Sequence, residues 1–361
     1  MNMKQLREKY ADELKILEPV PMPKACFWPA PAVRNSIITQ RENYLRILRR
    51  EKPMFMAIDL DEYMLSPAIF PDAVARGFVV DMDGMPESGP GGKDMFGIEW
   101  EYVEQVGGSM VRPGAPAVED IHKWEEAIVF PDIEQWDWEG SARRNAPLHT
   151  SAFATNVWIM NGIFERLISF MDFENAAVAL VDEEQQPSVH RLFDKLSDLY
   201  VDIIRHIKKY FQPDVIYFHD DWGSQRAPFF SLSTCREMIV PYLKKVVSAV
   251  HQEGMIFNFH SCGKNEPLVP AMIEAGVDTW CGQPMNDFPT LYEQYGEQIA
   301  LGIYTVPPAK DAPEEEVVKA VQDFLDTYTR KGVAYPVIYA DEYSDMYLDI
   351  LYMLSRERFS Q

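Results

Sequence analysis

The chain alternates short apolar runs with longer amphipathic stretches, and this alternation predicts its fold. The apolar runs are short enough to be strands, and polar residues begin where each run ends. Near-continuous apolar strands are typical of a parallel sheet whose outer face is covered by helices. We interpret eight runs as strands: 54–59, 78–81, 153–160, 215–220, 255–260, 277–281, 299–304 and 336–341.

Between the later runs, apolar residues recur at three and four positions, which is the helical period. These stretches are 187–210, 234–253, 264–275, 289–298 and 313–331. Eight strand-helix units close most simply into one barrel, so the predicted fold class is α/β, a single (β/α)8 TIM barrel. Enzymes with this fold place their chemistry at the carboxyl ends of the strands.

Two segments do not follow the alternation. Residues 1–50 precede the first apolar run and predict an N-terminal helical arm, which leaves 51–361 as the catalytic barrel domain. Residues from 84 to about 150 are rich in Gly, Pro and Trp, and they predict a long insertion after the second strand. We expect this insertion to fold over the mouth of the barrel.

The charge and the cysteine content narrow the class of partner. The net charge of -22, from 56 acidic and 34 basic residues, opposes binding to nucleic acid and to anionic membranes. We see no secretory leader and no apolar run near the length of a membrane span, and the 4 cysteines are too few for a disulfide scaffold. We therefore expect a cytoplasmic protein. The sequence does not decide between a monomer and a homodimer.

Two residue types that bind zinc stand one residue apart at the end of the 255–260 run. His260 and Cys262 occur in the sequence His-Ser-Cys-Gly, and a further cysteine, Cys281, ends the next predicted strand. Imidazole and thiolate are ligands that zinc accepts readily. The motif therefore predicts metal-assisted chemistry. The alternative is that these residues are a buried histidine and buried thiols with packing roles only.

Acidic residues follow two further strands. His219, Asp220 and Asp221 end the 215–220 run, and Glu342 follows the last run. Neighbouring carboxylates raise one another's pKa, which suits proton transfer, so we predict catalytic roles for all four residues. The alternative is that the two aspartates cap the next loop or pair with Arg226, and that Glu342 lies in a solvated loop. Which aspartate faces the site is left open.

Several short segments carry a family resemblance. The sequences at 218–225, 241–243, 260–263 and 274–278 resemble the uroporphyrinogen decarboxylase superfamily, and within it the corrinoid-dependent methyltransferases. Those at 94–100 and 130–132 resemble the branch that demethylates methoxylated aromatics in anaerobic bacteria. The resemblance covers about 40–345. It implies an O-demethylase component that moves the methyl of an aryl methyl ether to a Co(I) corrinoid.

The chain departs from the true decarboxylases where those enzymes bind the carboxylates of their substrate. They carry an arginine-rich stretch near the N-terminus, whereas the corresponding segment here has acids at Asp59, Asp61 and Glu62. A porphyrinogen with its many carboxylates would be repelled there. This departure favours methyl transfer over decarboxylation.

A second departure concerns the metal. The thiol-methylating members of the superfamily hold zinc with a His-x-Cys pair and a cysteine on the last strand, but residues 335–343 contain no cysteine. The resemblance therefore implies His260 and Cys262 as ligands, with the third ligand supplied by Cys281, or by Asp341 or Glu342. Three protein ligands would leave a fourth position open for catalysis.

The remaining candidates concern the substrate and the partner. Trp222, Tyr304 and Tyr343 are expected to line a flat pocket for the aromatic ring, with a hydrogen bond from Asn161 to an ether or phenol oxygen. Most aromatic residues near strand ends have only packing roles, which is the alternative. The chain lacks the Asp-x-His-x-x-Gly sequence of cobalamin carriers, so we expect a partner protein to supply the corrinoid.

Three rival functions stay open at this stage. A methylcorrinoid:thiol methyltransferase would share the His-Cys ligands and needs a small thiol pocket. A uroporphyrinogen decarboxylase would act without a metal. A non-catalytic ligand-binding barrel would use His260 and Cys262 for stability alone.

Overall fold

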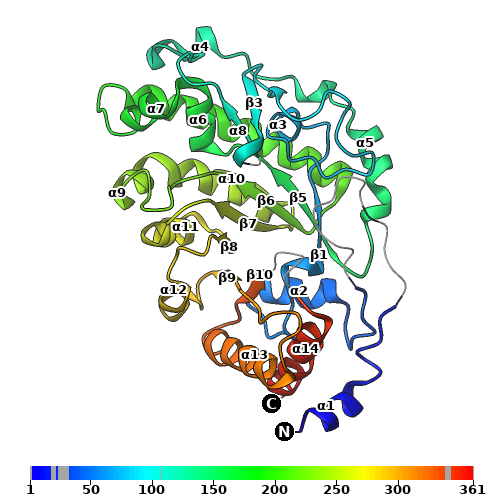
Figure 1. Cartoon of the computed structure of the whole chain (residues 1–361). Helices are drawn as coiled ribbons and strands as arrows, with labels where there is room; N and C mark the ends of the chain where they lie inside the picture. The colour runs from blue at the N-terminus through cyan, green and yellow to red at the C-terminus, as the bar shows by residue number, and fades with distance from the viewer. Residues whose placement is uncertain (1, 18–21, 23–31, 107, 338–342, 361) are drawn as a thin grey trace.

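The computed structural model describes residues 2–17, 22, 32–106, 108–337 and 343–360. At its centre lies a curled sheet of 7 parallel strands, with helices on its outer face (Figure 1). The architecture is therefore α/β and TIM-barrel-like. The strands, in their spatial order, are β1 (Glu62–Leu65), β5 (Ala154–Ile159), β6 (Val215–His219), β7 (Ile256–Ser261), β8 (Thr279–Gly282), β9 (Ala300–Tyr304) and β10 (Tyr335–Val337).

The runs from 153 onwards form strands where the apolar pattern predicts them, but the first two predictions were wrong. Residues 54–59 form no strand, and the chain turns through a short 3-10 helix, η1 (Asp59–Asp61), before β1 begins at Glu62. The cause is local, because the buried carboxylate of Asp61 accepts the backbone N–H of Ile58 and the amide of Gln40. The segment around η1 packs against β10.

The second predicted strand, 78–81, is also absent. Val80 makes only an isolated bridge with Ser66, and the carboxylate of Asp81 accepts the N–H groups of Ala68 and Asp83 instead of continuing a ladder. Within the described residues the sheet therefore has 7 strands where eight were predicted. The predicted positions 338–341 of the last strand lie outside those residues.

Helices follow the strands as the helical periodicity predicts. In α8, the buried residues Leu192, Leu196, Leu199, Ile203 and Ile207 recur at three and four positions and face the sheet. No helix in the described ranges is long and apolar enough to span a bilayer. The main helices after the third predicted strand are α6 (Ile163–Met171), α7 (Phe173–Ala179), α8 (Gln186–Phe211), α9 (Leu232–Thr234), α10 (Val240–Gln252), α11 (Val269–Ala275), α12 (Phe288–Tyr295), α13 (Glu314–Tyr328) and α14 (Asp345–Phe359).

The two segments outside the alternation have structure of their own. Within 1–50 lie α1 (Met3–Tyr10), which packs against α14, and α2 (Gln40–Leu48), which contacts β5. Between 84 and 150 lie an antiparallel sheet of β2 (Gly92–Lys93), β3 (Glu99–Val103) and β4 (Gly108–Val111), and the helices α4 (Trp124–Ala127) and α5 (Trp138–Asn145). A further helix, α3 (Pro71–Ala75), follows β1. The boundaries of the arm and the insertion stay predictions.

Candidate metal centre

The inner face of the sheet keeps some solvent exposure, whereas the outer face is buried beneath the helices. In β5, β7, β8 and β9 a single residue of each strand is half-buried, namely Trp158, His260, Cys281 and Tyr304. Each lies near the carboxyl end of its strand, and the register and the alternation of side chains place them on one face. This is the end of the sheet where barrel enzymes carry out their chemistry.

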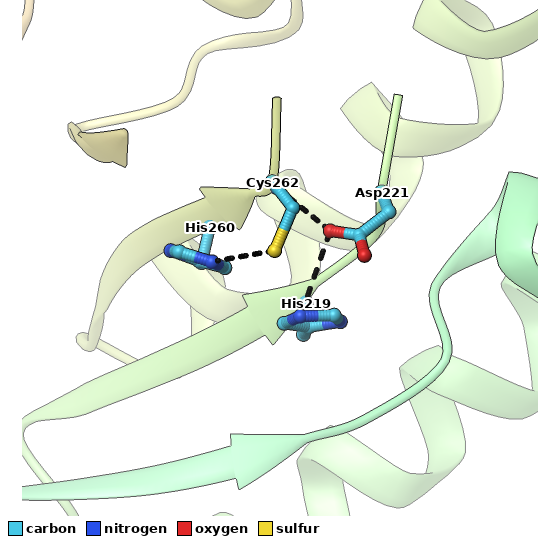
Figure 2. Close-up of side chains that lie close together, drawn as sticks. All are labelled: His219, Asp221, His260 and Cys262. Atoms are coloured by element: carbon cyan, nitrogen blue, oxygen red, sulfur yellow. Dashed lines mark hydrogen bonds and ion pairs between the residues drawn. The ribbon is translucent and has the colours of Figure 1, made fainter. Parts of the chain in front are cut away.

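Four side chains meet at this end of the sheet. They are His219, Asp221, His260 and Cys262, and one ligand atom from each lies within 4.8 Å of the others (Figure 2). His219 and His260 are paired in the register of β6 and β7. Asp221 and Cys262 each follow their histidine by two residues, so both strands deliver a donor pair to the same place.

Hydrogen bonds orient the ring of His260. Its Nδ1 lies 2.8 Å from the carbonyl oxygen of Cys281, which can only accept, so Nδ1 carries the proton. Its Nε2 lies 3.5 Å from Sγ of Cys262. Burial first, and then the neighbouring His219, lower the pKa of His260 to about 4. The imidazole is therefore neutral, with its lone pair directed at the thiol.

The ring of His219 is held in the same manner. Its Nδ1 donates to Oε2 of Glu165 at 2.8 Å, and its Nε2 lies 3.6 Å from Oδ1 of Asp221. Burial lowers the pKa of His219, but the carboxylates of Glu165 and Asp221 outweigh it and raise this pKa well above its ordinary value. In the absence of a metal the proton therefore lies between His219 and its carboxylates, and metal binding would release it.

Glu165, which orients His219, is itself held by Arg76. It lies in the first turn of α6, and its Oε1 accepts from Arg76 at 2.7 Å. Burial opposes ionisation of Glu165, yet Arg76 and His219 keep its pKa well below the ordinary value. A carboxylate that accepts from the distal nitrogen of a histidine fixes which nitrogen faces a metal. Arg76, Glu165 and His219 therefore form a chain that directs Nε2 of His219 towards Asp221.

The donor set fits a zinc ion. Bonds of about 2.0–2.3 Å in a tetrahedral zinc site place neighbouring ligand atoms about 3.3–3.8 Å apart. The separation of 3.5 Å between Cys262 Sγ and His260 Nε2, and that of 3.6 Å between Asp221 Oδ1 and His219 Nε2, lie in this range. Two imidazoles, a thiol and a carboxylate are ligands that zinc binds in proteins.

Asp220, predicted to be catalytic, is not among the four residues. Its carboxylate accepts the backbone N–H groups of Phe164 at 3.1 Å and Glu165 at 2.8 Å, and the indole N–H of Trp222 at 2.9 Å. Burial raises the pKa of Asp220 to about 7, and the charge of Glu165 adds to the shift. Asp220 therefore caps the start of α6, and Asp221 is the aspartate that faces the group.

Two residues predicted to bind substrate are fully buried and have partners within the protein. Nδ2 of Asn161 donates to Asp72 at 2.5 Å, and its Oδ1 accepts from Arg76 at 3.1 Å. The ring of Trp222 packs 4.6 Å from that of Phe259. The structure therefore engages both side chains inside the fold, Asn161 through hydrogen bonds and Trp222 through packing and a hydrogen bond to Asp220.

The other predicted residues are placed as follows. Tyr304 is half-buried at the end of β9, on the inner face, and Tyr343 packs its ring 5.0 Å from that of Tyr347. Cys281 lies beside His260 in the register of β7 and β8, but its thiol does not join the group of four. Glu342, like Asp341, lies outside the described residues.

Sequence reasoning missed His219 as a ligand and did not find Glu165 or Arg76. The signal for His219 was present, because His-x-Asp at 219–221 repeats the spacing of His-x-Cys at 260–262 on the adjacent strand. Glu165 and Arg76 belong to a helix and to the segment after α3, and no motif marks them. Only the folded chain brings them to His219.

A further carboxyl group lies on the inner face at Glu62, in β1. Its Oε1 accepts from Nδ2 of Asn156 at 3.0 Å, whereas its Oε2 is buried and has no hydrogen-bond partner. Burial raises the pKa of Glu62 from 4.5 to about 7. The folded chain therefore retains this proton over a range of pH in which the unfolded chain has lost it.

This shift predicts a pH-dependent effect of Glu62→Gln on stability. Because the unfolded chain releases the proton near 4.5 and the folded chain near 7, the parent loses stability as pH rises through that window, by about 3 kcal/mol in all. The variant has no such group, so its unfolding free energy should gain about 3 kcal/mol relative to the parent across the window. Urea titrations at stepped pH measure the difference. The exposed Glu99→Gln is the control, and a pH-independent difference for Glu62→Gln would contradict the assignment.

Comparisons with known proteins agree with the fold. Residues 159–335 match the family model described as uroporphyrinogen decarboxylase (URO-D), and the matched region contains all four residues of the candidate metal centre. This match supports the resemblance to the URO-D superfamily. No curated protein sequence matches the chain.

Among solved structures, a methyltransferase from Methanosarcina mazei has a TM-score of 0.59 at 14% sequence identity, over 90% of this chain and 100% of that chain. A D-psicose 3-epimerase from Clostridium cellulolyticum H10 has a TM-score of 0.35 at 12% identity, over 62% of this chain and 81% of that chain. At such identities the first likeness shows a shared fold, and it extends over nearly the whole chain.

Proposed function

We propose that this chain is a methyltransferase that moves the methyl group of a methoxylated aromatic compound to the Co(I) corrinoid of a partner protein. The observation that carries the proposal is the convergence of His219, Asp221, His260 and Cys262 at the carboxyl ends of β6 and β7. The URO-D match and the likeness to a methyltransferase fold support methyl transfer as the reaction class. The aromatic ether and the corrinoid partner come from the resemblance of the sequence motifs.

The reaction needs help at the ether oxygen. The bond between the methyl carbon and the oxygen breaks with its electron pair left on the oxygen, while Co(I) supplies the pair for the new carbon–cobalt bond. The leaving group is a phenolate, whose conjugate acid has a pKa near ~10, so it leaves slowly without assistance. A zinc ion held by three of the four residues would keep one position open and would supply a Lewis acid for this oxygen.

Hydrogen bonds within the protein orient the two histidines of the group of four. Glu165 holds Nδ1 of His219, and the carbonyl of Cys281 holds Nδ1 of His260, so that both Nε2 atoms are preset towards Asp221 and Cys262. Preset donors lose little freedom when the site is assembled, which keeps the stabilisation available for the transition state.

A stack of aromatic rings lies beside the candidate metal centre on the inner face. The indole of Trp158 stacks on Tyr217 with ring centres 3.9 Å apart and on Phe78 at 4.9 Å, and Tyr217 stacks on His260 at 5.7 Å. This row of parallel rings ends at the candidate metal centre. The sequence favoured Trp222, Tyr304 and Tyr343 for binding the aromatic ring, and of these Tyr304 lies on the inner face at the end of β9.

The charge of the inner face disfavours decarboxylation of a porphyrinogen. The described strands of the central sheet contain no Lys or Arg, and Glu62 adds an acid. Arg76, whose charge interacts with Asp221 and Cys262, is paired with Glu165 at 2.7 Å. A substrate with many carboxylates would meet no free counter-charge on these strands.

The test is anaerobic incubation of the purified protein with a Co(I) corrinoid, free and on a carrier protein, and a panel of methoxybenzenes and methoxyphenols. We expect the absorption spectrum to change to that of methyl-Co(III) in the presence of at least one ether. Absence of transfer from every ether, together with methylation of a thiol by methyl-Co(III), would replace the proposal with the thiol methyltransferase. Conversion of a porphyrinogen without metal would replace it with the decarboxylase.

A further inference from the structure

Side chains, and not the sheet, hold the backbone around Cys262, the residue that supplies the thiol of the candidate metal centre. Cys262 and Gly263 lie just beyond the end of β7, so their backbone N–H and C=O groups need partners outside the strand. Each of these four groups pairs with a different side chain. The four side chains come from the loops that follow three adjacent strands, β6, β7 and β8.

Two of these bonds fix the peptide groups on either side of the Cα atom of Cys262. Its N–H donates to Oδ1 of Asp221 at 2.7 Å (Figure 2), and its carbonyl accepts from Nδ2 of Asn265 at 2.6 Å. Asn265 is fully buried, and the same Nδ2 lies 2.9 Å from Oγ of Ser261. The start of the Cys262 side chain therefore has a fixed position and direction.

The other two bonds come from the loop after β8. The N–H of Gly263 donates to Oε1 of Gln283 at 2.7 Å, and its carbonyl accepts from Nδ2 of Asn286 at 3.0 Å. Asn286 is buried, and its Oδ1 accepts two further N–H groups of the Cys262 loop, the nearer from Asn265 at 2.8 Å. A loop that contributes no donor atom to the group of four thus holds the loop that carries Cys262.

Gly263 lets the loops after β6 and β7 pack backbone against backbone. Its φ is +96°, in the left-handed region that favours glycine. A Cβ atom at this position would lie 2.4 Å from the backbone carbonyl of Gly223. Close contact between the two loops keeps Cys262 and Asp221 in one relative position.

We infer that Gln283 and Asn286 are positioning residues for the metal, because they hold the backbone of Cys262 so that its Sγ is preset beside Nε2 of His260. A ligand whose backbone is already fixed loses less conformational freedom when the metal binds. Residues that orient ligands in this way typically change metal affinity by about 10- to 100-fold. The inference rests on the metal site of the proposed function and extends that site to the end of β8.

Titration with Co(II), which accepts the ligands of zinc, tests the inference without corrinoid or ether. A bond from thiolate to Co(II) gives a charge-transfer band in the near ultraviolet, and the intensity of the visible d–d bands reports the coordination geometry. Asn286→Ala should weaken Co(II) binding about 10- to 100-fold and lower the d–d intensity. Gln283→Ala removes one hydrogen bond from a half-buried side chain and should weaken binding severalfold. It carries the test if Asn286→Ala fails to fold.

Two further variants separate positioning from stability. Asn286→Asp keeps an oxygen for the two N–H groups but loses the donor to Gly263, so its Co(II) affinity should lie between those of Asn286→Ala and the parent. Asn43, in α2, is a matched control, because it is fully buried and also holds a loop, with Oδ1 accepting the N–H of Met54 at 2.7 Å and Nδ2 donating to the carbonyl of Phe55 at 2.8 Å. Asn43→Ala should lose stability in urea without metal but bind Co(II) as the parent does.

The inference and the proposed function fail separately. Unchanged Co(II) affinity and spectrum in both Asn286→Ala and Gln283→Ala would overturn the inference and leave the group of four in place. An equal loss of affinity in Asn43→Ala would also overturn it, since the effect would then be a general loss of stability. A parent without the thiolate band would remove the metal centre and the inference together. If the variants behave as expected but no ether yields methyl-Co(III), the positioning role stands and the proposed reaction is removed.

Discussion

Changing Cys262 to Ala is expected to reduce bound zinc from about one ion per chain to near zero and to reduce methyl transfer by at least about 10²- to 10³-fold. The thiol is the one soft donor in the group of four, and its Sγ lies 3.5 Å from Nε2 of His260. His260→Ala should have the same two effects, because the ring supplies the other donor of that pair. Zinc is measured by atomic emission after dialysis, and transfer by the cobalt spectrum.

The cysteines provide matched controls for this experiment. Cys235→Ala changes a buried thiol in a helical segment outside the site, so zinc content and transfer should both stay near those of the parent. Cys281→Ala distinguishes the group of four from a site in which Cys281 is the third ligand. Zinc should be retained in this variant if His219 and Asp221 complete the site. Zinc retained in Cys262→Ala, or lost only in Cys281→Ala, would contradict the arrangement in Figure 2.

The apolar runs predicted the later strands because burial on both faces leaves a signal in the sequence itself. All five residues of β6, for example, are buried, and its run is apolar as far as His219. The run at 54–59 is equally apolar but forms no strand, because the carboxylate of Asp61 accepts the backbone N–H of Ile58 and the chain turns there. Competition from a side chain two or three residues away is not visible in hydrophobic periodicity.

The sequence predicted those residues of the candidate site that lie at the ends of predicted strands. His260 and Cys262 stand in one motif, and His219 and Asp221 repeat its spacing, so adjacent strands were enough to bring them together. Asp220 looked equivalent to Asp221 in the sequence, but side chains alternate along a strand, and Asp220 points to the start of α6. Glu165 and Arg76 were not predicted, because their contacts exist only once the fold brings them to His219.

The largest effect on stability is expected from Arg166→Met. Arg166, in α6, is fully buried and pairs with the buried carboxylates of Asp94, at 2.6 Å, and Asp72. Its guanidinium also lies 4.8 Å from the ring centre of Phe96. Removing the guanidinium leaves two buried carboxylates without a cation, and breaking a buried pair in this way costs about 3–5 kcal/mol. Urea unfolding of the variant should show a loss of this size.

Arg144→Met is the matched control, because Arg144 also pairs with two carboxylates, Asp137 at 3.1 Å and Asp83 at 3.3 Å, but at the surface. Exposed pairs contribute at most about 1 kcal/mol, so this variant should unfold close to the parent. Equal losses in the two variants would show that burial of Arg166 does not set its contribution to the free energy of unfolding.

The stability of α6 matters for the candidate metal centre, because Glu165 precedes Arg166 in α6 and holds His219. The same turn of helix therefore anchors the 84–150 segment through Asp94 and orients a proposed metal ligand.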